Sequence, residues 1–80
     1  MEPRIKKVKT RKDHTLVLTF NNGEIRTFDM TPYLNIGVFQ LLKDWSHFRR
    51  AKAMFGTVVW PDDIDIAPET LYLESVPYKN

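Results

Sequence analysis

The sequence predicts an α+β fold in which a small antiparallel sheet packs against short helices. An Asn22-Gly23 dipeptide separates two runs of β-forming residues, which is the strongest short-range signal of a hairpin. Apolar residues then recur at helical spacing between positions 38 and 45, and a second β-rich run, residues 51–60, stops at Pro61. We therefore expect three N-terminal strands plus a C-terminal strand pair, packed against short helices.

The chain is short, and we interpret residues 1–80 as a single domain. A chain of this length buries a smaller fraction of its surface than a larger protein does. It contains no cysteine, so stability must come from packing or from self-association rather than from disulfides or thiolate metal sites. We place the core at about residues 3–73 and expect the tail, Val76–Asn80, to fray.

The first hairpin is predicted to turn through a two-residue type I′ loop, because asparagine and glycine both accept the positive φ that this turn requires. Such a loop pairs Phe20 with Ile25 across the two strands. One face of the hairpin would then carry four apolar side chains, those of Leu16, Leu18, Phe20 and Ile25.

The segment before this hairpin has only Ile5 and Val8 as apolar anchors. Their spacing of three residues does not fit one face of a regular strand, so we expect a β-bulge or an edge position there. Lysine-rich edge strands also resist edge-to-edge aggregation, which gives the neighbouring lysines a structural purpose.

Two short helical segments are expected after the hairpin. Thr31 before Pro32 predicts an N-cap followed by proline at the first helical position, and Gly37 closes that turn. Asp44 is expected to cap a later helix over residues 45–50. Between them, four apolar residues at i, i+3, i+4 and i+7 are predicted to face the sheet, and these are Val38, Leu41, Leu42 and Trp45.

The last third of the chain predicts a second hairpin and a closing helical turn. The run over residues 51–60 bends at Gly56, and Val58 and Trp60 alternate with more exposed positions. Pro68 can open a final helical turn, on which Leu71 and Leu73 are expected to close the core.

Charge is unevenly distributed along the chain, although the formal net charge is only +2. Half of the basic residues lie within the first twelve positions, whereas six of the ten acidic residues lie in the second half. No apolar run approaches the roughly 20 residues of a membrane helix, and no apolar stretch of a signal peptide follows the N-terminus. We therefore expect a cytoplasmic protein with no membrane partner.

The patterns of the common catalytic and cofactor sites do not occur in this sequence. Asp62, Asp63 and Asp65 lack the glycine and the bidentate glutamate of a calcium loop, and we interpret them as a solvated turn. His14 and His47 have no evident serine and carboxylate partners, and the three glycines are too far apart for a phosphate loop. We expect no catalytic, cofactor or metal residues, and therefore not an enzyme.

Basic residues near the N-terminus and near position 50 form the strongest site-like feature. If the strand and the helix end converge, these residues could contact phosphates, and the candidate nucleic-acid contacts are Lys6, Lys7, Lys9, Arg11, Arg49 and Arg50. The competing interpretation is a solvated edge that resists aggregation. Aromatic residues are not interleaved with these charges, as stacking on single-stranded nucleic acid would require.

Phe39 is the candidate interface residue, because it lies off the predicted helical stripe and is expected to be exposed. An exposed aromatic at such a position suits a protein interface, although it could also pack under the sheet.

The motif order resembles a known prokaryotic family. The segments are PRIKKVKTRKDHTLVLTFNNGEIRTFD, GVFQLLKD, FRRAK and GTVVWPDDIDIAPETLY, and together they span residues 3 to about 73. They resemble the domain of unknown function 2442 family. Members of that family usually have an Asn-Gly-like turn after the Trp-Pro pair, whereas this chain has Asp62-Asp63. Aspartate tolerates positive φ less well than glycine, so a tight turn is less favourable here.

The resemblance implies an α+β fold and a bacterial, cytoplasmic setting, but no activity. It also implies members that stand alone or precede a helix-turn-helix domain, and that often lie beside another short gene in a toxin-antitoxin-like arrangement. Our leading hypothesis is a non-enzymatic protein-interaction or regulatory module that binds a small protein partner or itself. The alternative is a nucleic-acid-binding module that uses the N-terminal basic face.

Overall fold

The structure is a computed structural model that describes residues 3–79, and it has the predicted α+β architecture. Strands β1 (Ile5–Thr10), β2 (Thr15–Phe20), β3 (Ile25–Asp29) and β7 (Val76–Pro77) form a four-stranded antiparallel sheet in that order. Strands β4 (Lys52–Met54), β5 (Thr57–Trp60) and β6 (Ile64–Ile66) form a three-stranded antiparallel sheet. The helical segments are η1 (Thr31–Tyr33), η2 (Gly37–Lys43), α1 (Trp45–Phe48) and α2 (Pro68–Leu73).

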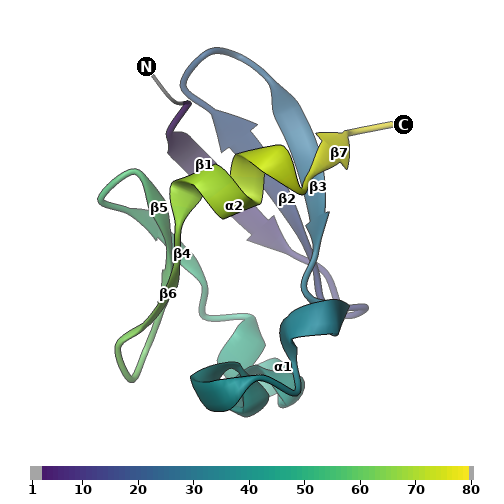
Figure 1. Ribbon diagram of the computed structural model, residues 1–80, viewed down its shortest axis with the longest axis vertical. Coiled ribbons are helices and arrows are strands. Elements are labelled where there is room, and N and C mark those ends of the chain that lie inside the picture. Colours follow the sequence, from purple (N-terminus) through teal and green to yellow (C-terminus); the bar gives the residue numbers. More distant parts are fainter. Residues whose placement is uncertain (1–2, 80) are drawn as a thin grey trace.

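The two sheets and the helices enclose one hydrophobic core. Figure 1 shows α2 crossing in front of the space between the sheets, with η2 and α1 closing the lower end. Each sheet directs one face inward, so each also has an outer face, away from the core. The largest fully buried side chains come from both sheets and from the helical segments, and they include Phe20, Phe28, Phe48, Leu42, Ile64 and Leu71.

The first hairpin has a three-residue loop, and the predicted two-residue register is wrong. Thr19 pairs with Ile25, and the Phe20 backbone N–H donates to the Glu24 carbonyl at 2.8 Å. Only Gly23 in this loop has positive φ, which is typical of a type I turn followed by a glycine bulge. The one-residue shift exchanges the faces of β3, so Phe28 is buried and Ile25 is 47% exposed. On β2, Leu16, Leu18 and Phe20 are buried as predicted.

The bulge predicted in the first strand is confirmed. The pairing of β1 with β2 shifts register between Ile5 and Lys7, and β1 lies at the edge of its sheet. Ile5 is thereby buried, and its backbone N–H donates to the Gly56 carbonyl at 2.9 Å. This bond ties the tip of the β4–β5 hairpin to the edge of the other sheet.

The segment over residues 37–43 is a 3₁₀-helix, and of the predicted α-helical stripe only Leu42 and Trp45 are confirmed as packing against the core. With three residues per turn, the inward positions of η2 fall every third residue, so Phe39 and Leu42 pack against the core. Trp45, the first residue of α1, packs there as well. Val38 and Leu41, predicted to face the sheet, are exposed. Phe39, predicted to be exposed, is partly buried, and its ring lies 6.2 Å from that of Tyr33.

The helix caps agree with the sequence in one case and differ in the other. Asp44 caps α1 as predicted, accepting from the Ser46 backbone N–H at 3.1 Å and from its hydroxyl at 2.9 Å. These hydrogen bonds hold the pKa of the Asp44 carboxyl below its usual value. The expected Thr31 cap is wrong, because η1 begins one residue earlier than assumed and Thr31 lies inside it.

The three-stranded sheet contains one strand more than the predicted pair, namely β6. The connection between β4 and β5, Phe55-Gly56, has positive φ at both residues. The two-residue type I′ hairpin expected at Asn22-Gly23 therefore occurs here instead. In the connection between β5 and β6, Asp62 and Asp63 both have positive φ, so this turn forms although it contains no glycine.

The C-terminal segment differs from the prediction. Leu71 is buried as expected, but Leu73 is 77% exposed. The tail was expected to fray, yet Val76 and Pro77 pair with β3, and Tyr78 donates its backbone N–H to the Ile25 carbonyl at 3.0 Å. Asn80 lies outside the described residues.

A network of hydrogen bonds and a cation–π contact connects α2 and the residue before β7 to the first hairpin. The Arg26 guanidinium donates to the Ser75 hydroxyl at 2.6 Å and to the Ser75 carbonyl at 2.8 Å, and lies over the Tyr72 ring. The Tyr72 hydroxyl donates to the Glu24 carboxylate at 2.6 Å. This bond lowers the pKa of Glu24 and raises that of Tyr72.

Candidate functional site

The outer face of the three-stranded sheet carries a row of opposite charges with an apolar centre. Lys52 on β4 pairs with Val59 on β5, which pairs in turn with Asp65 on β6, so the three side chains lie in line across the strands. Val58 and Trp60 alternate with Val59 and point into the core. Lys52 and Asp65 are exposed at the two sides of this face, and Val59 is half-buried between them.

Phe55 stands at the tip of the β4–β5 hairpin beside this face. It is 83% exposed, the largest exposed fraction among the large hydrophobic side chains of residues 3–79, and its φ of 55° lies in the left-handed region. Backbone strain of this kind is disfavoured for aromatic residues and is concentrated at functional sites. Met54 is also exposed, so the hairpin presents two neighbouring apolar side chains to solvent.

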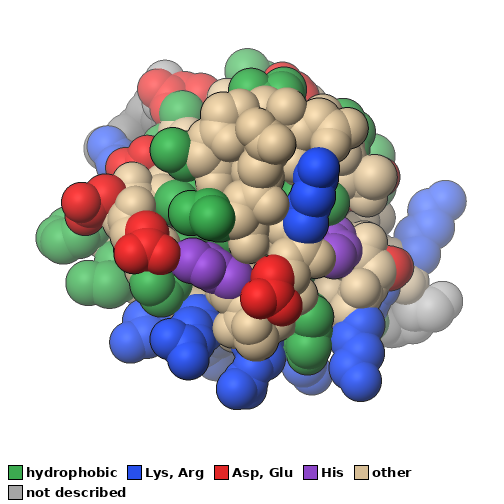
Figure 2. Space-filling model, turned by 90° about the horizontal axis from the view of Figure 1, so that it is seen from below, with side chains coloured by type: hydrophobic (Ala, Val, Ile, Leu, Met, Phe, Trp, Pro, Cys, Tyr) green, Lys and Arg blue, Asp and Glu red, His purple; other side chains and the backbone are tan. Residues whose placement is uncertain are grey.

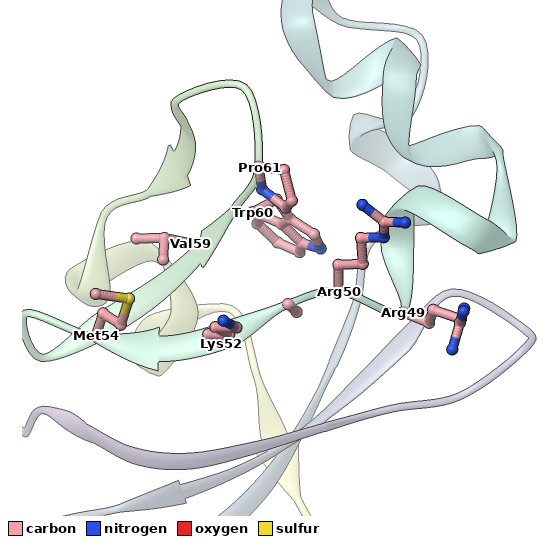
Figure 3. Close-up of a pocket in the computed structure, with 8 residues that line it drawn as sticks. Arg49, Arg50, Lys52, Met54, Val59, Trp60 and Pro61 are labelled. Atoms are coloured by element: carbon pink, nitrogen blue, oxygen red, sulfur yellow. The ribbon is translucent and has the colours of Figure 1, made fainter.

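A hollow of about 540 Å³, the basic hollow, lies at one side of the same face. Its lining includes Arg49, Arg50, Lys52, Met54 and Val59, together with Trp60. In Figure 3 Arg50 turns upward beside Trp60 and Pro61, whereas Arg49 points away from them. A basic margin around apolar side chains suits a partner that carries both an acidic group and an apolar one.

A second hollow, the acidic hollow, of about 290 Å³, adjoins the first. It is lined by Phe55, Asp63 and Asp65, and it shares Met54, Val59 and Trp60 with the basic hollow. Trp60 is held in place because its indole N–H donates to the Phe48 carbonyl at 2.9 Å. The two hollows therefore flank a fixed apolar centre and have margins of opposite charge.

The candidate nucleic-acid contacts are divided between two surfaces. Lys7 and Lys9 pair with Thr19 and Val17, so they lie on the outer face of the four-stranded sheet. Arg11 joins them there, with its guanidinium 5.5 Å from the centre of the Tyr78 ring. Lys6 is exposed at the bulge, whereas Arg49 and Arg50 belong to the basic hollow. Tyr78 therefore belongs to this basic face. The sequence does not predict this position, because Tyr78 lies in the segment that is expected to fray.

Many basic side chains gather on one part of the surface. Figure 2 shows a group of Lys and Arg side chains along the lower border of one face, with others elsewhere on it, and Asp and Glu side chains that include several at its left and one near its centre. Part of the acidic side is fixed by His47, whose Nε2 lies 3.5 Å from the Asp62 carboxylate and 3.2 Å from the Pro61 carbonyl.

The structure forms no candidate metal cluster from residues 3–79. In that range no three His, Cys, Asp or Glu side chains are grouped so that they could hold a metal ion, and Asp62, Asp63 and Asp65 are exposed around a turn. The two histidines are used differently, since the His14 ring packs 4.8 Å from that of Phe48 and His47 contacts the Pro61–Asp62 turn. The helices within residues 3–79 are also too short to cross a membrane.

Comparisons with known proteins bear on the family. Searches among curated proteins and among solved structures each gave no match. A family model described as a protein of unknown function, DUF2442, matches residues 5–77, which is nearly the whole chain. With its NNGE hairpin and its GTVVWP strand in place within that match, the chain belongs to the DUF2442 family.

Proposed function

We propose that this protein is a non-enzymatic protein-interaction or regulatory module that binds its partner on the outer face of the three-stranded sheet. The observation that carries the proposal is Phe55, an aromatic side chain that is 83% exposed at a strained hairpin tip beside that face. Exposed aromatic anchors beside hollows with an apolar centre are typical hot spots of protein interfaces. The bacterial, cytoplasmic setting and the toxin-antitoxin-like gene pairing that the family resemblance implies belong to the same proposal.

Co-expression with the short protein encoded beside the gene, followed by co-purification, tests this proposal. Phe55→Ser should abolish association, because it removes the aromatic anchor. Leu73→Ser is the matched control, since Leu73 is 77% exposed but lies on α2. Equal effects of the two substitutions would contradict the assigned surface. A wild-type chain that binds no adjacent-gene product and stays monomeric at high concentration would contradict the function.

Binding of single-stranded nucleic acid is the second candidate function. It is favoured by Lys7, Lys9 and Arg11, which share the uncovered face of the four-stranded sheet with Tyr78. A basic surface with an aromatic platform is the arrangement that tracks phosphates and stacks bases.

Salt dependence separates this candidate from the first. Affinity for a single-stranded oligonucleotide should fall steeply with salt, and the triple substitution Lys7→Gln, Lys9→Gln and Arg11→Gln should flatten the slope of log K against log salt. Replacing Arg49 and Arg50 with glutamine, on the other surface, should leave the slope unchanged. No binding at low salt, or a slope that the triple substitution does not change, would dismiss this candidate.

A further inference from the structure

We infer that the outer face of the three-stranded sheet binds a second copy of this chain across a two-fold axis parallel to β5. This inference rests on the proposed function and names the partner. A two-fold interface requires a surface that is complementary to itself. The row Lys52, Val59, Asp65 meets that requirement, because it is basic at one side, apolar at the centre and acidic at the other.

The direction of the axis follows from the sheet register. Rotation about an axis that runs along β5 and above Val59 exchanges the β4 side of the face with the β6 side. Lys52 of one copy then lies over Asp65 of the second copy, and the reverse pair forms at the same time. An axis in the plane of the face but perpendicular to β5 would instead bring Lys52 over Lys52, and like charges in an interface repel.

The charges of the segments that flank the sheet are also complementary under the same rotation. Arg50 precedes β4 and Asp63 precedes β6, so both lie at the Trp60 end of β5 but on opposite sides of the axis. The rotation therefore brings the basic hollow of one copy over the acidic hollow of the other. An acidic peptide would complement only the basic half of the face, whereas a second copy complements both halves.

Phe55 lies close to the proposed axis. The turn that carries it joins β4 to β5, so its backbone is offset from β5 by no more than the strand spacing of about 4.8 Å. The two Phe55 side chains would therefore lie side by side at one end of the interface and lose their exposure to water. Aromatic pairs of this kind contribute more than their buried area alone.

The small size of the face limits the expected affinity. The face is built on strands of only three or four residues, whereas a standard interface buries roughly 800 Å² per partner. The dimer should therefore be weak, with a dissociation constant in the micromolar to millimolar range, and it should tighten at low salt.

Sedimentation of the full chain with paired charge reversals tests the inference. K52D alone makes the row acidic in both copies, and D65K alone makes it basic in both, so each variant should dimerise at least about tenfold more weakly than the wild type. An equimolar mixture of the two variants should recover dimers, because an acidic row then faces a basic row. K7D, on the outer face of the other sheet, is the control and should dimerise like the wild type.

The outcomes separate this inference from the proposed function. If K52D and D65K dimerise as tightly as the wild type, or if their mixture dimerises no more tightly than each variant alone, the proposed axis and surface are wrong. A wild-type monomer at millimolar concentration would overturn the inference, and the proposed function would survive only if the adjacent-gene protein still binds through Phe55. Circular dichroism reports whether each variant folds. If a charge reversal unfolds the chain, F55S is a further variant for the test, and it should prevent dimerisation.

Discussion

At the scale of single residues, Phe55 occupies a position that local physics disfavours. Its backbone has a φ of 55°, and its exposed side chain adds little to the core. Asparagine and glycine adopt this conformation at lower cost and are usual in two-residue hairpin turns. A residue that breaks a local rule without a compensating gain in stability is expected at a functional position. The sequence alone did not reveal Phe55, because the positive φ appears only once the hairpin register is known.

Phe55→Asn should stabilise the fold and weaken binding in the same molecule. Relief of the left-handed strain should raise the free energy of unfolding by about 1 kcal/mol, measured by urea denaturation. Association with the partner or with a second copy should fall, as for Phe55→Ser. A less stable variant would show that the Phe55 ring contributes to the fold, and unchanged association would exclude it as an anchor.

At the scale of elements, the sequence predicted the fold class and several local features better than the register of the strands. The α+β class, the β1 bulge and the Asp44 cap follow from local signals, and the structure confirms them. The face of β3 depended on whether the Asn22-Gly23 loop has two or three residues, and both choices place Gly23 at positive φ. Local signals could not decide between them, and one residue exchanges the whole strand face.

The 3₁₀-helix η2 was mispredicted for a related reason. Val38, Leu41 and Leu42 fit an α-helical stripe, but the segment is short and winds with three residues per turn. Leu42 is therefore buried as predicted, whereas Leu41, also predicted to face the sheet, is exposed. Likewise, β7 has two residues and gains its structure from long-range contacts with β3, which local sequence does not encode.

Adjacent leucines on η2 should respond very differently to truncation. Leu42→Ala should cost about 2 to 5 kcal/mol of unfolding free energy, because Leu42 is fully buried and its removal leaves a cavity. Leu41→Ala should cost well under half of that, since Leu41 is 49% exposed. Urea denaturation measures both values. Equal losses would mean that η2 packs as the α-helical stripe originally predicted.

Acidification should weaken the attachment of α2 to the first hairpin. The hydrogen bond from Tyr72 is the largest cause that lowers the pKa of Glu24 from its ordinary value of 4.5, so the ionised carboxylate is favoured in the folded state. Its stabilisation is present above the unfolded pKa and is lost as the pH falls through the folded pKa.

Glu24→Gln isolates this effect from those of the other carboxylates. The difference in unfolding free energy between the wild type and Glu24→Gln should be largest at neutral pH and should shrink as the pH drops below about 4.5. Contributions such as that of Asp44 are common to both proteins and cancel. Urea denaturation across pH 3 to 7 provides the measurement. A difference independent of pH would show that the Glu24 charge does not support the network.

At the scale of the whole molecule, two uncovered sheet faces remain outside one shared core. The outer face of the four-stranded sheet is basic, whereas that of the three-stranded sheet carries both charges around an apolar centre. Sequence reasoning found the basic residues but grouped Arg49 and Arg50 with the N-terminal lysines, because it could not place β4 on a second sheet. Only the face of mixed charge is complementary to itself.

Nuclear magnetic resonance of the labelled full chain locates the interaction surface most directly. Amide shifts followed from micromolar to millimolar concentration should change over residues 49–65, on the outer face of the three-stranded sheet, and should stay constant at Lys7, Lys9 and Thr19. Concentration-dependent shifts on the four-stranded sheet instead, or none over the whole range, would contradict a dimer built on the row of Lys52, Val59 and Asp65.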